Sequence, residues 1–471
     1  MKIAYLHYHL KTGGVTTVLK QQLAALARQT EQLVITGAPP ATPLDADTIH
    51  IPELGYSSDY KATFKPVDVV RAIIKAIRTK FNGPCDILHV HNPTLAKNRQ
   101  FLDILKLLQH EGLNLLLQIH DFAEDGRPLA YFSESYPADC HYGVINQRDY
   151  QILLKSGLKP DGLHLMENTV TVPSPKMTRK PEIEDRMALY PIRAIRRKNI
   201  GEALLLSLFM KPGQSVEITL PPNSAVDIKS YRGWKNFVRD HGFNLKFDRG
   251  LSHDFESLVL SAGFLISTSI TEGFGFSFLE PWLFGKLLWG RKIVDICRDF
   301  ENNGIRLEHL YAGLYVPIDW IGLEQFRDQW HDCALKACSL FNFSIENARL
   351  RDAFDYITSD GLIDFGLLDE SSQKRVILHS SSPGKDSAEL IRINPFLAAP
   401  GMVSGKNELI EHNKQAILKK YSLDSYRNNL LNVYRKVSTA PVKQEIDKTV
   451  LVSSFLNPEK FSLLKWGEDS G

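Results

Sequence analysis

The chain has 471 residues, of which 43% are hydrophobic and 23% are charged, a balance that is ordinary for a folded globular protein. At roughly 100–200 residues per domain, this length predicts two or three domains. The formal net charge of only +2 excludes the strongly charged surface of proteins that bind nucleic acid or membranes through bulk charge.

Cysteine content and hydropathy indicate the compartment. The five cysteines form no Cys-x-x-Cys pair, so neither a zinc framework nor a disulfide framework is visible, which is typical of a reducing compartment. The first apolar run, residues 3–8, is too short for a secretory signal. No uninterrupted apolar run reaches the ~20 residues needed to span a bilayer. The sequence therefore predicts a cytoplasmic protein.

Short apolar runs alternate with amphipathic stretches such as VVRAIIKAIRTKF over residues 1–170. Alternation of strands and helices predicts βαβ units and a parallel sheet. We expect strands at 2–8, 32–37, 87–91, 115–120, 142–146 and 163–166.

Residues 166–186, MENTVTVPSPKMTRKPEIEDR, contain prolines and polar residues that indicate a linker. A second alternation follows, with strands expected at 188–195, 215–220, 245–248 and 264–269. Two such regions predict an α/β protein with two doubly wound, Rossmann-like domains, at 1–170 and 186–420.

The C-terminal part of the chain is expected to differ in regularity. Residues 330–400 show a weaker pattern and predict an irregular region of the second domain. The stretch NELIEHNKQAILKKY and residues 421–438 predict two helices, the second capped by Ser422. Residues 439–471 predict a weakly ordered tail.

A glycine pair, Gly13–Gly14, separates the first strand from the helix after it. Glycine lets the backbone approach a ligand closely, and a helix N-terminus presents free N–H groups to an anion. A phosphate could bind there, although paired glycines are also common in ordinary turns. The segment is not the G-x-G-x-x-G dinucleotide fingerprint, which weakens a dehydrogenase interpretation.

The most specific motif is ITEGFGFSFLEP, which follows the expected strand at 264–269 and precedes an apolar helix. Glu272 and Glu280 are separated by seven residues, among them Gly273 and Gly275. Such a turn can present a carboxylate and backbone N–H groups to a ligand, with the second carboxylate two helical turns further on, placed to bind a ribose diol. The alternative is a glycine turn followed by a surface glutamate, but the position after a strand of the second domain favours function.

Arg193 and Lys198 lie in the turn between a strand and a helix, in YPIRAIRRKNIGEALLL. Both can neutralise a diphosphate, although a solvated basic turn is the alternative because Arg196 and Arg197 lie there too.

These three features together resemble the retaining glycosyltransferases of family 4, and EGFGFSFLE resembles that family's Glu–seven residues–Glu signature. The resemblance covers most of residues 1–320, is weak from 320 to 400 and returns in the C-terminal helices. It implies the GT-B fold, in which two Rossmann-like domains face a central cleft and the last helix crosses back to the first domain. The sequence departs from the family at Trp289 and Arg291, where bulky residues predict a specialised part of the cleft.

The resemblance also implies roles for individual residues. Arg193 and Lys198 would bind the donor diphosphate, while Glu272 with Gly273, Phe274 and Gly275 would hold the transferred sugar. Glu280 would bind the nucleotide ribose, the helix after Gly13 and Gly14 would complete the phosphate site, and His120 would lie near the reacting centre.

The implied reaction retains the anomeric configuration by same-face attack, with the leaving phosphate accepting the acceptor's proton, so Glu272 is not assigned as a nucleophile. UDP-glucose is the first expectation for the donor and GDP-mannose the second, and the nucleotide sugar is a substrate, so no cofactor is expected. No metal is expected either, since the only Asp-x-Asp, Asp45–Asp47, is interpreted as a polar loop.

The acceptor is expected to be a small polar molecule bound by the first domain. His91, Asn92 and Lys97 follow one strand, and Asp121 and Arg127 follow the next. The cations can bind a phosphate or carboxylate, as in a sugar phosphate or glycerate derivative, whereas the carboxylates can instead bind sugar hydroxyls. A solvated helix start is the plain alternative.

Three other functions share the expected fold. A nucleotide-sugar epimerase would act on the donor without an acceptor. A sugar phosphorylase would need a pyridoxal-phosphate lysine, which cannot be identified in the sequence. A non-catalytic scaffold is disfavoured because Lys198, Glu272 and Glu280 are all present.

Overall fold

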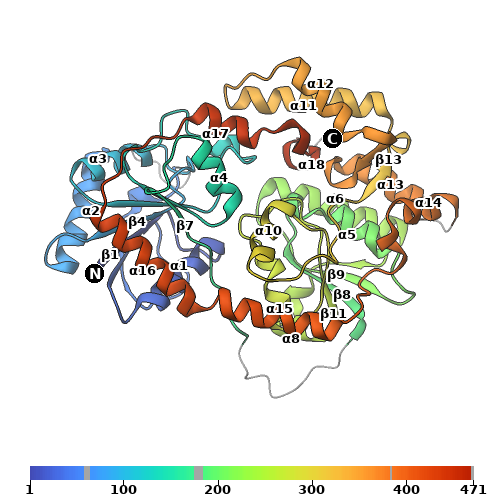
Figure 1. The fold of residues 1–471 in the computed structure, drawn as a ribbon, viewed down its shortest axis with the longest axis horizontal. Helices are drawn as coiled ribbons and strands as arrows, with labels where there is room; N and C mark the ends of the chain where they lie inside the picture. Colours follow the sequence, from blue (N-terminus) through green and yellow to red (C-terminus); the bar gives the residue numbers. More distant parts are fainter. Residues whose placement is uncertain (58–63, 174–183, 382–383, 468–471) are drawn as a thin grey trace. The chain divides into compact units, whose positions relative to one another are not determined.

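The computed structural model describes residues 1–57, 64–173, 184–381 and 384–467 (Figure 1). The chain divides into two compact units. The first unit comprises Met1–Thr169 and Lys419–Leu456, and the second comprises Val170–Leu418 and Asn457–Gly471. Each unit is therefore built from two separate stretches of the chain.

A fully parallel seven-stranded sheet forms the centre of the first unit, in the order β3-β2-β1-β4-β5-β6-β7. Its central strands are mostly apolar, as expected for strands buried on both faces, although β4 and β5 also bury His89, His91 and Gln118. The expected strands are found with ends shifted by one or two residues, and the short edge strand β3 was not expected. The strands are β1 (Lys2–His7), β2 (Glu31–Thr36), β3 (Asp47–His50), β4 (Ile87–His91), β5 (Leu115–Ile119), β6 (His141–Val144) and β7 (Leu163–Leu165).

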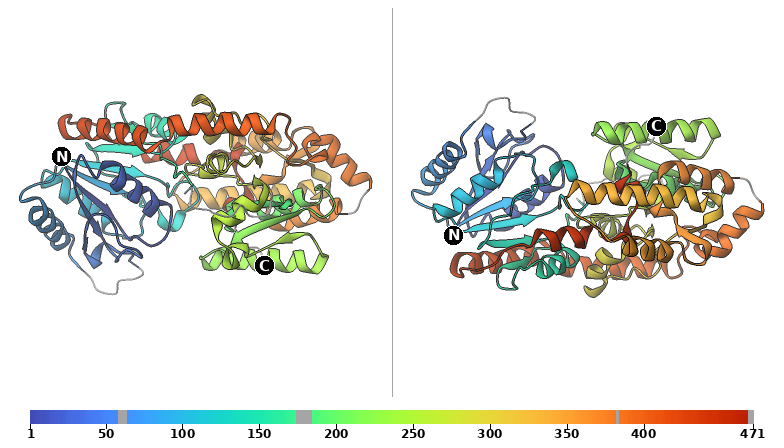
Figure 2. Two further views of the ribbon diagram at one scale, coloured as in Figure 1. Left: turned by 90° about the horizontal axis from the view of Figure 1, so that it is seen from below. Right: turned by 90° about the horizontal axis from the view of Figure 1, so that it is seen from above.

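Helices cover both faces of this sheet, α2 (Pro66–Phe81) and α3 (Phe101–His110) on one side and α1 (Gly14–Leu26) on the other (Figure 2). Residues of β1 alternate between the two layers: Ala4 and Leu6 pack under α2 and α3, while Ile3 and Tyr5 pack under α1. This alternation follows from the two-residue repeat of a strand.

The helix α16 (Leu423–Thr439) packs beside α1, so the chain returns to the first unit as expected for the C-terminal helix. Ser422 caps it by accepting a hydrogen bond from the Ser425 N–H, which confirms the expected cap. The Arg427 Nε donates to the Ala25 carbonyl at 2.6 Å, and the Tyr434 hydroxyl lies 2.8 Å from His89 Nδ1. Together these contacts fix α16 on the sheet of the first unit.

The expectation of a weakly ordered tail after residue 438 is wrong. The chain forms α17 (Lys448–Phe455), which packs on α4 (Gln147–Lys155), and then α18 (Leu463–Trp466). Leu451 and Leu464 are buried. Scattered apolar residues therefore bury their side chains in the two units rather than staying solvated.

A parallel five-stranded sheet forms the centre of the second unit, in the order β10-β9-β8-β11-β12. In the chain, α5 (Ile200–Ser207) follows β8 and α6 (Ala225–His241) follows β9. Because β8 begins at Glu184, the strand starts inside the segment expected to be a linker, of which 174–183 lie outside the described residues. The strands are β8 (Glu184–Arg193), β9 (Ser215–Leu220), β10 (Leu245–Lys246), β11 (Ala262–Ser267) and β12 (Leu288–Gly290).

Residues 330–400 were expected to be irregular, and the structure shows instead that they are largely helical. Buried aromatic rings hold this layer together: Phe354 lies 5.9 Å from Phe326 and 5.6 Å from Trp330 between ring centroids. The elements are α11 (Leu323–Leu340), α12 (Asn347–Ile357), β14 (Leu362–Asp364), α13 (Glu370–Ser380) and α14 (Lys385–Ile393), and β14 pairs antiparallel with β13 (Tyr315–Pro317). Apart from α11, which has 18 residues, these helices have 9 to 11 residues, so each carries only a brief periodic pattern.

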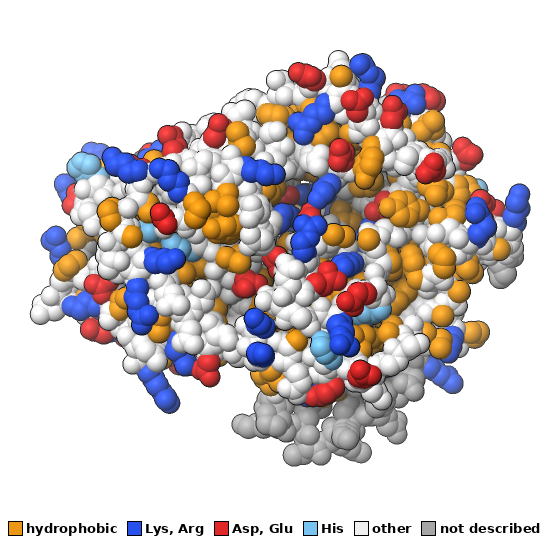
Figure 3. Space-filling model, in the orientation of Figure 1, with side chains coloured by type: hydrophobic (Ala, Val, Ile, Leu, Met, Phe, Trp, Pro, Cys, Tyr) orange, Lys and Arg blue, Asp and Glu red, His pale blue; other side chains and the backbone are white. Residues whose placement is uncertain are grey.

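Positive and negative side chains lie interspersed on the face of the molecule drawn in Figure 3. This distribution agrees with a net charge near zero and gives no continuous surface of one sign on that face.

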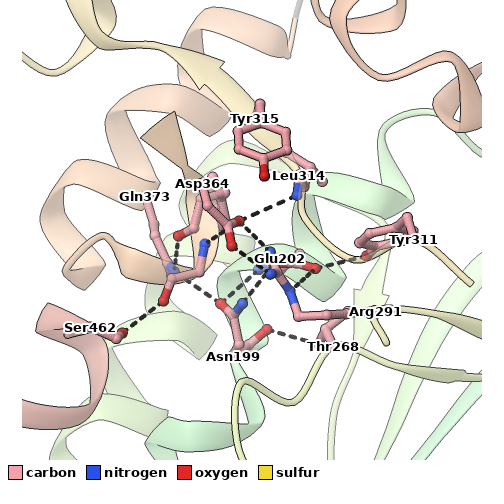
Figure 4. A network of polar contacts seen from close by, with 12 residues as sticks. Asn199, Glu202, Thr268, Arg291, Tyr311, Leu314, Tyr315, Asp364, Gln373 and Ser462 are labelled. Atoms are coloured by element: carbon pink, nitrogen blue, oxygen red, sulfur yellow. Dashed lines mark hydrogen bonds and ion pairs between the residues drawn. The ribbon is translucent and has the colours of Figure 1, made fainter. Parts of the chain in front are cut away.

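A buried ionic network joins α5, β12 and β14 in the second unit (Figure 4). Arg291 donates to both carboxylate oxygens of Glu202, at 2.6 to 3.0 Å, and to both oxygens of Asp364 at 2.7 Å. The Tyr311 hydroxyl adds a bond of 2.7 Å to Glu202. Arg291 and Trp289, expected to specialise a cleft, are 5% and 3% exposed, so they build the interior of the unit instead.

We predict that Arg291→Met strongly destabilises the protein. The change leaves the carboxylate of Glu202 buried without its cation, and breaking such a pair typically costs about 3–5 kcal/mol. Urea unfolding with a probe specific to the second unit measures this loss. Arg239→Ala, which removes an exposed pair with Asp240, is the control and should change stability by less than about 0.5 kcal/mol. Equal stability of the two variants would contradict the prediction.

Candidate active site

In each sheet the strand order reverses at one point, between β1 and β4 in the first unit and between β8 and β11 in the second. Ligands of doubly wound folds bind outside the carboxyl ends of the strands at this point. The segments that leave these four strands carry most of the residues predicted from the sequence. Each edge is therefore a candidate site of its own unit.

Hydrogen bonds tie together the two loops at the edge of the second unit. After β8 the chain forms the 3-10 turn η3 (Arg196–Lys198), and Asn199 then caps α5. The carbonyl of Lys198 accepts from the Tyr190 hydroxyl at 2.8 Å and from Thr268 Oγ1, just after β11, at 3.0 Å. The Ile270 N–H donates to the Arg197 carbonyl at 3.0 Å. The loops after β8 and β11 are thus held in a fixed register.

This register brings Lys198 and Glu272 into an ion pair, with side chains only 15% and 10% exposed. Burial alone raises the pKa of Glu272, but the charges of Lys198 and Arg197 outweigh burial and hold it below its ordinary value. Glu272 is therefore an ionised hydrogen-bond acceptor near neutral pH and a poor proton donor.

Arg193 and Arg197 occupy different surroundings. The exposed Arg193 donates from Nη1 to the Pro221 carbonyl at 2.9 Å, so its guanidinium is engaged at the end of β9. The Arg197 charge acts on Glu272 instead, and its buried Nε has no hydrogen-bond partner among the described residues. The role of Arg193 stays a prediction. Arg197 is an additional candidate, hidden in the sequence by the basic run that suggested a solvated turn.

The glycine-rich turn keeps its backbone close to neighbouring side chains. Gly275 has a φ of 92°, and a Cβ there would lie 3.0 Å from Ile296 and Phe278. Phe274 is 5% exposed and its ring packs on Phe276 and Phe300, so its side chain is interior and only its backbone can meet a ligand. Gly275 is therefore required by the tight turn, while the contact of Gly273 and Gly275 with a ligand stays a prediction.

Glu280 does not lie two turns along a helix, as had been expected. The chain passes through the 3-10 turn η4 (Phe276–Phe278), and Glu280 is the first residue of the four-residue helix α9 (Glu280–Leu283). The left-handed backbone at Gly275 and the proline at position 281 explain why no longer helix forms.

The carboxylate of Glu280 is partly buried and has no hydrogen bond or ion pair with any described residue. Burial raises its pKa to about 7, because no cation or donor offsets the loss of water. A carboxylate kept without partners is available to bind donor groups of a ligand.

At the edge of the first unit, Gly13 is the N-cap of α1 and Gly14 its first residue. Neither glycine is required by the local fold: Gly13 has an extended φ of 173°, and an added Cβ would meet nothing closer than 3.9 Å. Both are exposed, and the first turn of α1 has no acidic residue. The helix start therefore has room for an anion.

Histidines line the carboxyl ends of β4 and β5. A hydrogen bond of 2.9 Å joins His91 Nδ1 to His120 Nε2, and both rings are buried. Burial lowers the pKa of His120 to about 4 and holds that of His91 well below its ordinary value, so both are neutral at physiological pH. Asn92 accepts the N–H groups of His120 and Asp121 at 2.7 and 3.2 Å, and this fixes the turn after β5.

Lys97, Asp121 and Arg127 form a charged cluster on this edge. Arg127 Nη2 donates to Asp121 at 2.9 Å, and both side chains are about one-third exposed. Burial and the nearby Arg127 lower the pKa of Lys97. The Lys97 Nζ lies 5.7 Å from the centroid of the Tyr56 ring. The Tyr56 hydroxyl is 2.9 Å from His9 Nε2. Tyr56 and His9 belong to no motif, so the sequence analysis missed them. The cluster does bring together the predicted residues Lys97, Asp121 and Arg127, of which two are cations and one is an anion.

No group of three or more histidine, cysteine or acidic side chains is arranged to hold a metal ion in the part of the chain that the structure describes. Asp47 begins the edge strand β3 and pairs with Lys80. Among the described residues, no helix is long and apolar enough to cross a membrane.

The sequence and the fold were compared with known proteins. No protein-family model matches the sequence. The chain is 26% identical to the mannosylglucosyl-3-phosphoglycerate synthase of Petrotoga mobilis, over 97% of this chain and 98% of that protein.

Similar solved structures include a glycosyltransferase of Rickettsia africae, with a TM-score of 0.54 and 13% identity over 93% of this chain and 99% of that one. Sucrose-phosphate synthase of Thermosynechococcus elongatus has a TM-score of 0.53 and 12% identity, over 92% and 98%. Anabaena HepE, in complex with UDP and glucose, has a TM-score of 0.51 and 11% identity, over 92% and 99%. The chain therefore has the GT-B fold and is related to glycosyltransferases.

Proposed function

We propose that the chain is a retaining glycosyltransferase of family 4 that transfers a hexose from a nucleotide diphosphate sugar to a small anionic acceptor. The observation that carries this proposal is the Lys198–Glu272 ion pair at the switch point of the second unit, beside the charge of Arg197. Lys198 and Arg197 supply positive charge for a diphosphate, and the ionised carboxylate of Glu272 can accept hydrogen bonds from sugar hydroxyls.

The relatives support this proposal by what they bind or make. One structural neighbour was solved with UDP and glucose, which supports a nucleotide sugar as the donor. The names of the Petrotoga relative and of sucrose-phosphate synthase both contain a phosphorylated product. The first of these names contains two hexoses, so UDP-glucose and GDP-mannose both stay candidate donors.

The charges of the second unit match the needs of the reaction. As the bond between the anomeric carbon and the diphosphate breaks, negative charge grows on the leaving phosphate, and cations already in place stabilise it. Lys198 and Arg197, with Arg193 as a further predicted contact, would supply this charge. Glu272 would accept hydrogen bonds from the sugar, and its lowered pKa fits this role better than proton donation.

The first unit would hold the acceptor. Lys97 and Arg127 supply two positive charges. Asp121 is paired with Arg127, and Asp125, which also acts on Arg127, is itself paired with Arg148, so the two cations favour a phosphate or carboxylate on the acceptor. His120 is neutral and adjoins this cluster through Asp121. The remaining predicted contacts of this unit are His91, Asn92, Gly13 and Gly14.

We predict that Lys198→Met lowers transfer by about 10²–10³-fold, because removing one preorganised contact to developing charge typically costs this much. The assay incubates UDP-glucose or GDP-mannose with 3-phosphoglycerate or glucosyl-3-phosphoglycerate and follows the sugar by NMR. Retention at the anomeric centre is read from the product's coupling constants.

Lys292→Met is the matched control, since it removes another lysine–glutamate pair of the second unit, with Glu301. It should keep wild-type turnover, and the melting temperatures of both variants separate lost chemistry from lost folding. Conversion of the donor without any acceptor would indicate an epimerase and overturn the proposal.

We predict that Lys97→Met raises the acceptor KM about tenfold while leaving the donor KM unchanged, since a hydrogen bond to a charged group is worth about 1.5–3 kcal/mol. Lys159→Met, on a separate loop of the first unit, should leave both constants unchanged. Steady-state kinetics with each substrate varied in turn gives both constants. An unaltered acceptor KM would remove Lys97 from the acceptor site.

We predict that donor binding weakens as the pH falls from 8 to 6. The carboxyl group of Glu280, whose pKa is about 7, loses acceptor capacity for ribose hydroxyls when it is protonated. Linkage allows up to about a tenfold change in Kd per pH unit below the pKa. Calorimetry of UDP or GDP binding measures the Kd at each pH in the wild type and in Glu280→Gln. The variant should lose the part of the pH dependence that comes from the titration of Glu280. Identical profiles in the two proteins would show that Glu280 does not contact the nucleotide.

A further inference from the structure

Lys448, the first residue of α17, is bound to one segment of the first unit by several contacts. Its ammonium donates to the carbonyls of Phe132 and Glu134, the second at 3.0 Å. The same Nζ lies 4.1 Å over the centroid of the Tyr131 ring and 4.3 Å over that of Tyr136. One ammonium group from the C-terminal part of the chain therefore makes four contacts within residues 131–136.

Residues 131–136 in turn contact both loops that carry the predicted acceptor residues. The Tyr136 hydroxyl donates to Glu124 at 2.8 Å, within the loop that leads to Arg127. Next to this segment, the Ala130 carbonyl accepts the Ala96 N–H at 2.7 Å, one residue before Lys97. A displacement of residues 130–136 would therefore move both cations of the acceptor cluster.

We propose that Lys448 is a positioning residue of the acceptor site, which fixes the distance between Lys97 and Arg127 and so sets the affinity for an anionic acceptor. This inference rests on the proposed function, because it assigns a role to the same charged cluster. Lys448 itself touches no predicted substrate group and acts through residues 130–136.

The surroundings of Lys448 make this clamp sensitive to pH. Burial lowers the pKa of Lys448 to about 8, although Glu124 and Glu134 oppose this change and Lys106 adds to it. The ammonium is present below about pH 8 and is lost above it. A neutral amine has no cation–π attraction to Tyr131 and Tyr136, so the clamp weakens as the pH rises.

The test compares Lys448→Met, Lys448→Arg and the matched control Lys2→Met. Lys2 also donates to a backbone carbonyl of the first unit, that of Phe81 at 2.8 Å, but it does so at the start of β1, away from the acceptor cluster. Calorimetry gives the Kd of 3-phosphoglycerate for each full-length protein, and steady-state assays give the KM of acceptor and donor separately.

Lys448→Met should weaken 3-phosphoglycerate binding about tenfold and raise the acceptor KM equally, with the donor KM unchanged, as expected for one lost charge-assisted contact. Lys448→Arg should restore most of the affinity and should extend tight binding to pH values above 8. Lys2→Met should bind as the wild type does. The loss of affinity centred near pH 8 should disappear in Lys448→Met, while the titration of Lys97 remains in every variant.

Two results would overturn the inference. One is an unchanged Kd in Lys448→Met together with a lower melting temperature, which would show that the lysine only stabilises the fold. The other is a wild-type protein that binds neither 3-phosphoglycerate nor inorganic phosphate. If the wild type binds the anion but transfers no sugar, the proposed function fails, while the order of Kd values among the variants still decides the role of Lys448.

Discussion

The carbonyl oxygen of Lys198 joins the two loops on which the candidate donor site depends. It accepts hydrogen bonds from Tyr190 of β8 and from Thr268 after β11, so the ends of two neighbouring parallel strands share one acceptor atom. With the bond from the Ile270 N–H to the Arg197 carbonyl, this shared acceptor holds the two loops that carry Lys198 and Glu272 together. The two strands and this carbonyl oxygen together fix the positions of Lys198 and Glu272.

This atom is connected to a buried polar network of the second unit. Asn199, next in the chain, caps α5 and donates to Glu202, and Glu202 is held by Arg291, which also binds Asp364 (Figure 4). The loop that presents Lys198 is thus anchored to α5, β12 and β14 at once. A buried ionic network is a costly way to gain stability, but it fixes the relative position of the elements that it joins. Here one of those elements, α5, directly follows the turn that carries Lys198.

The sequence predicts the strands of both sheets well, because strands buried on both faces are mostly apolar. It misses β3, which is short, polar and at a sheet edge, and it misses the helices between residues 330 and 400, whose periodic patterns are brief. The signature turn is found by its glycines, but the 3-10 turn before Glu280 depends on local backbone geometry that spacing does not reveal. Arg193 and Arg197 were also hard to tell apart, because both lie close to the same turn in the sequence. Only the tertiary contacts show that Arg193 binds the Pro221 carbonyl and that the charge of Arg197 acts on Glu272.

The division of each unit between two stretches of chain has a consequence for synthesis on the ribosome. The first unit lacks α16 and α17 until residue 456 has been made, although its whole sheet is complete by residue 165. The second unit waits slightly longer, since Arg196 in the Lys198 turn donates to the carbonyl of Gly467 at 2.6 Å. The usual order, in which the N-terminal domain matures while the rest is still being translated, therefore cannot run to completion here. Each unit therefore needs residues from the same C-terminal stretch of the chain before its contacts are complete.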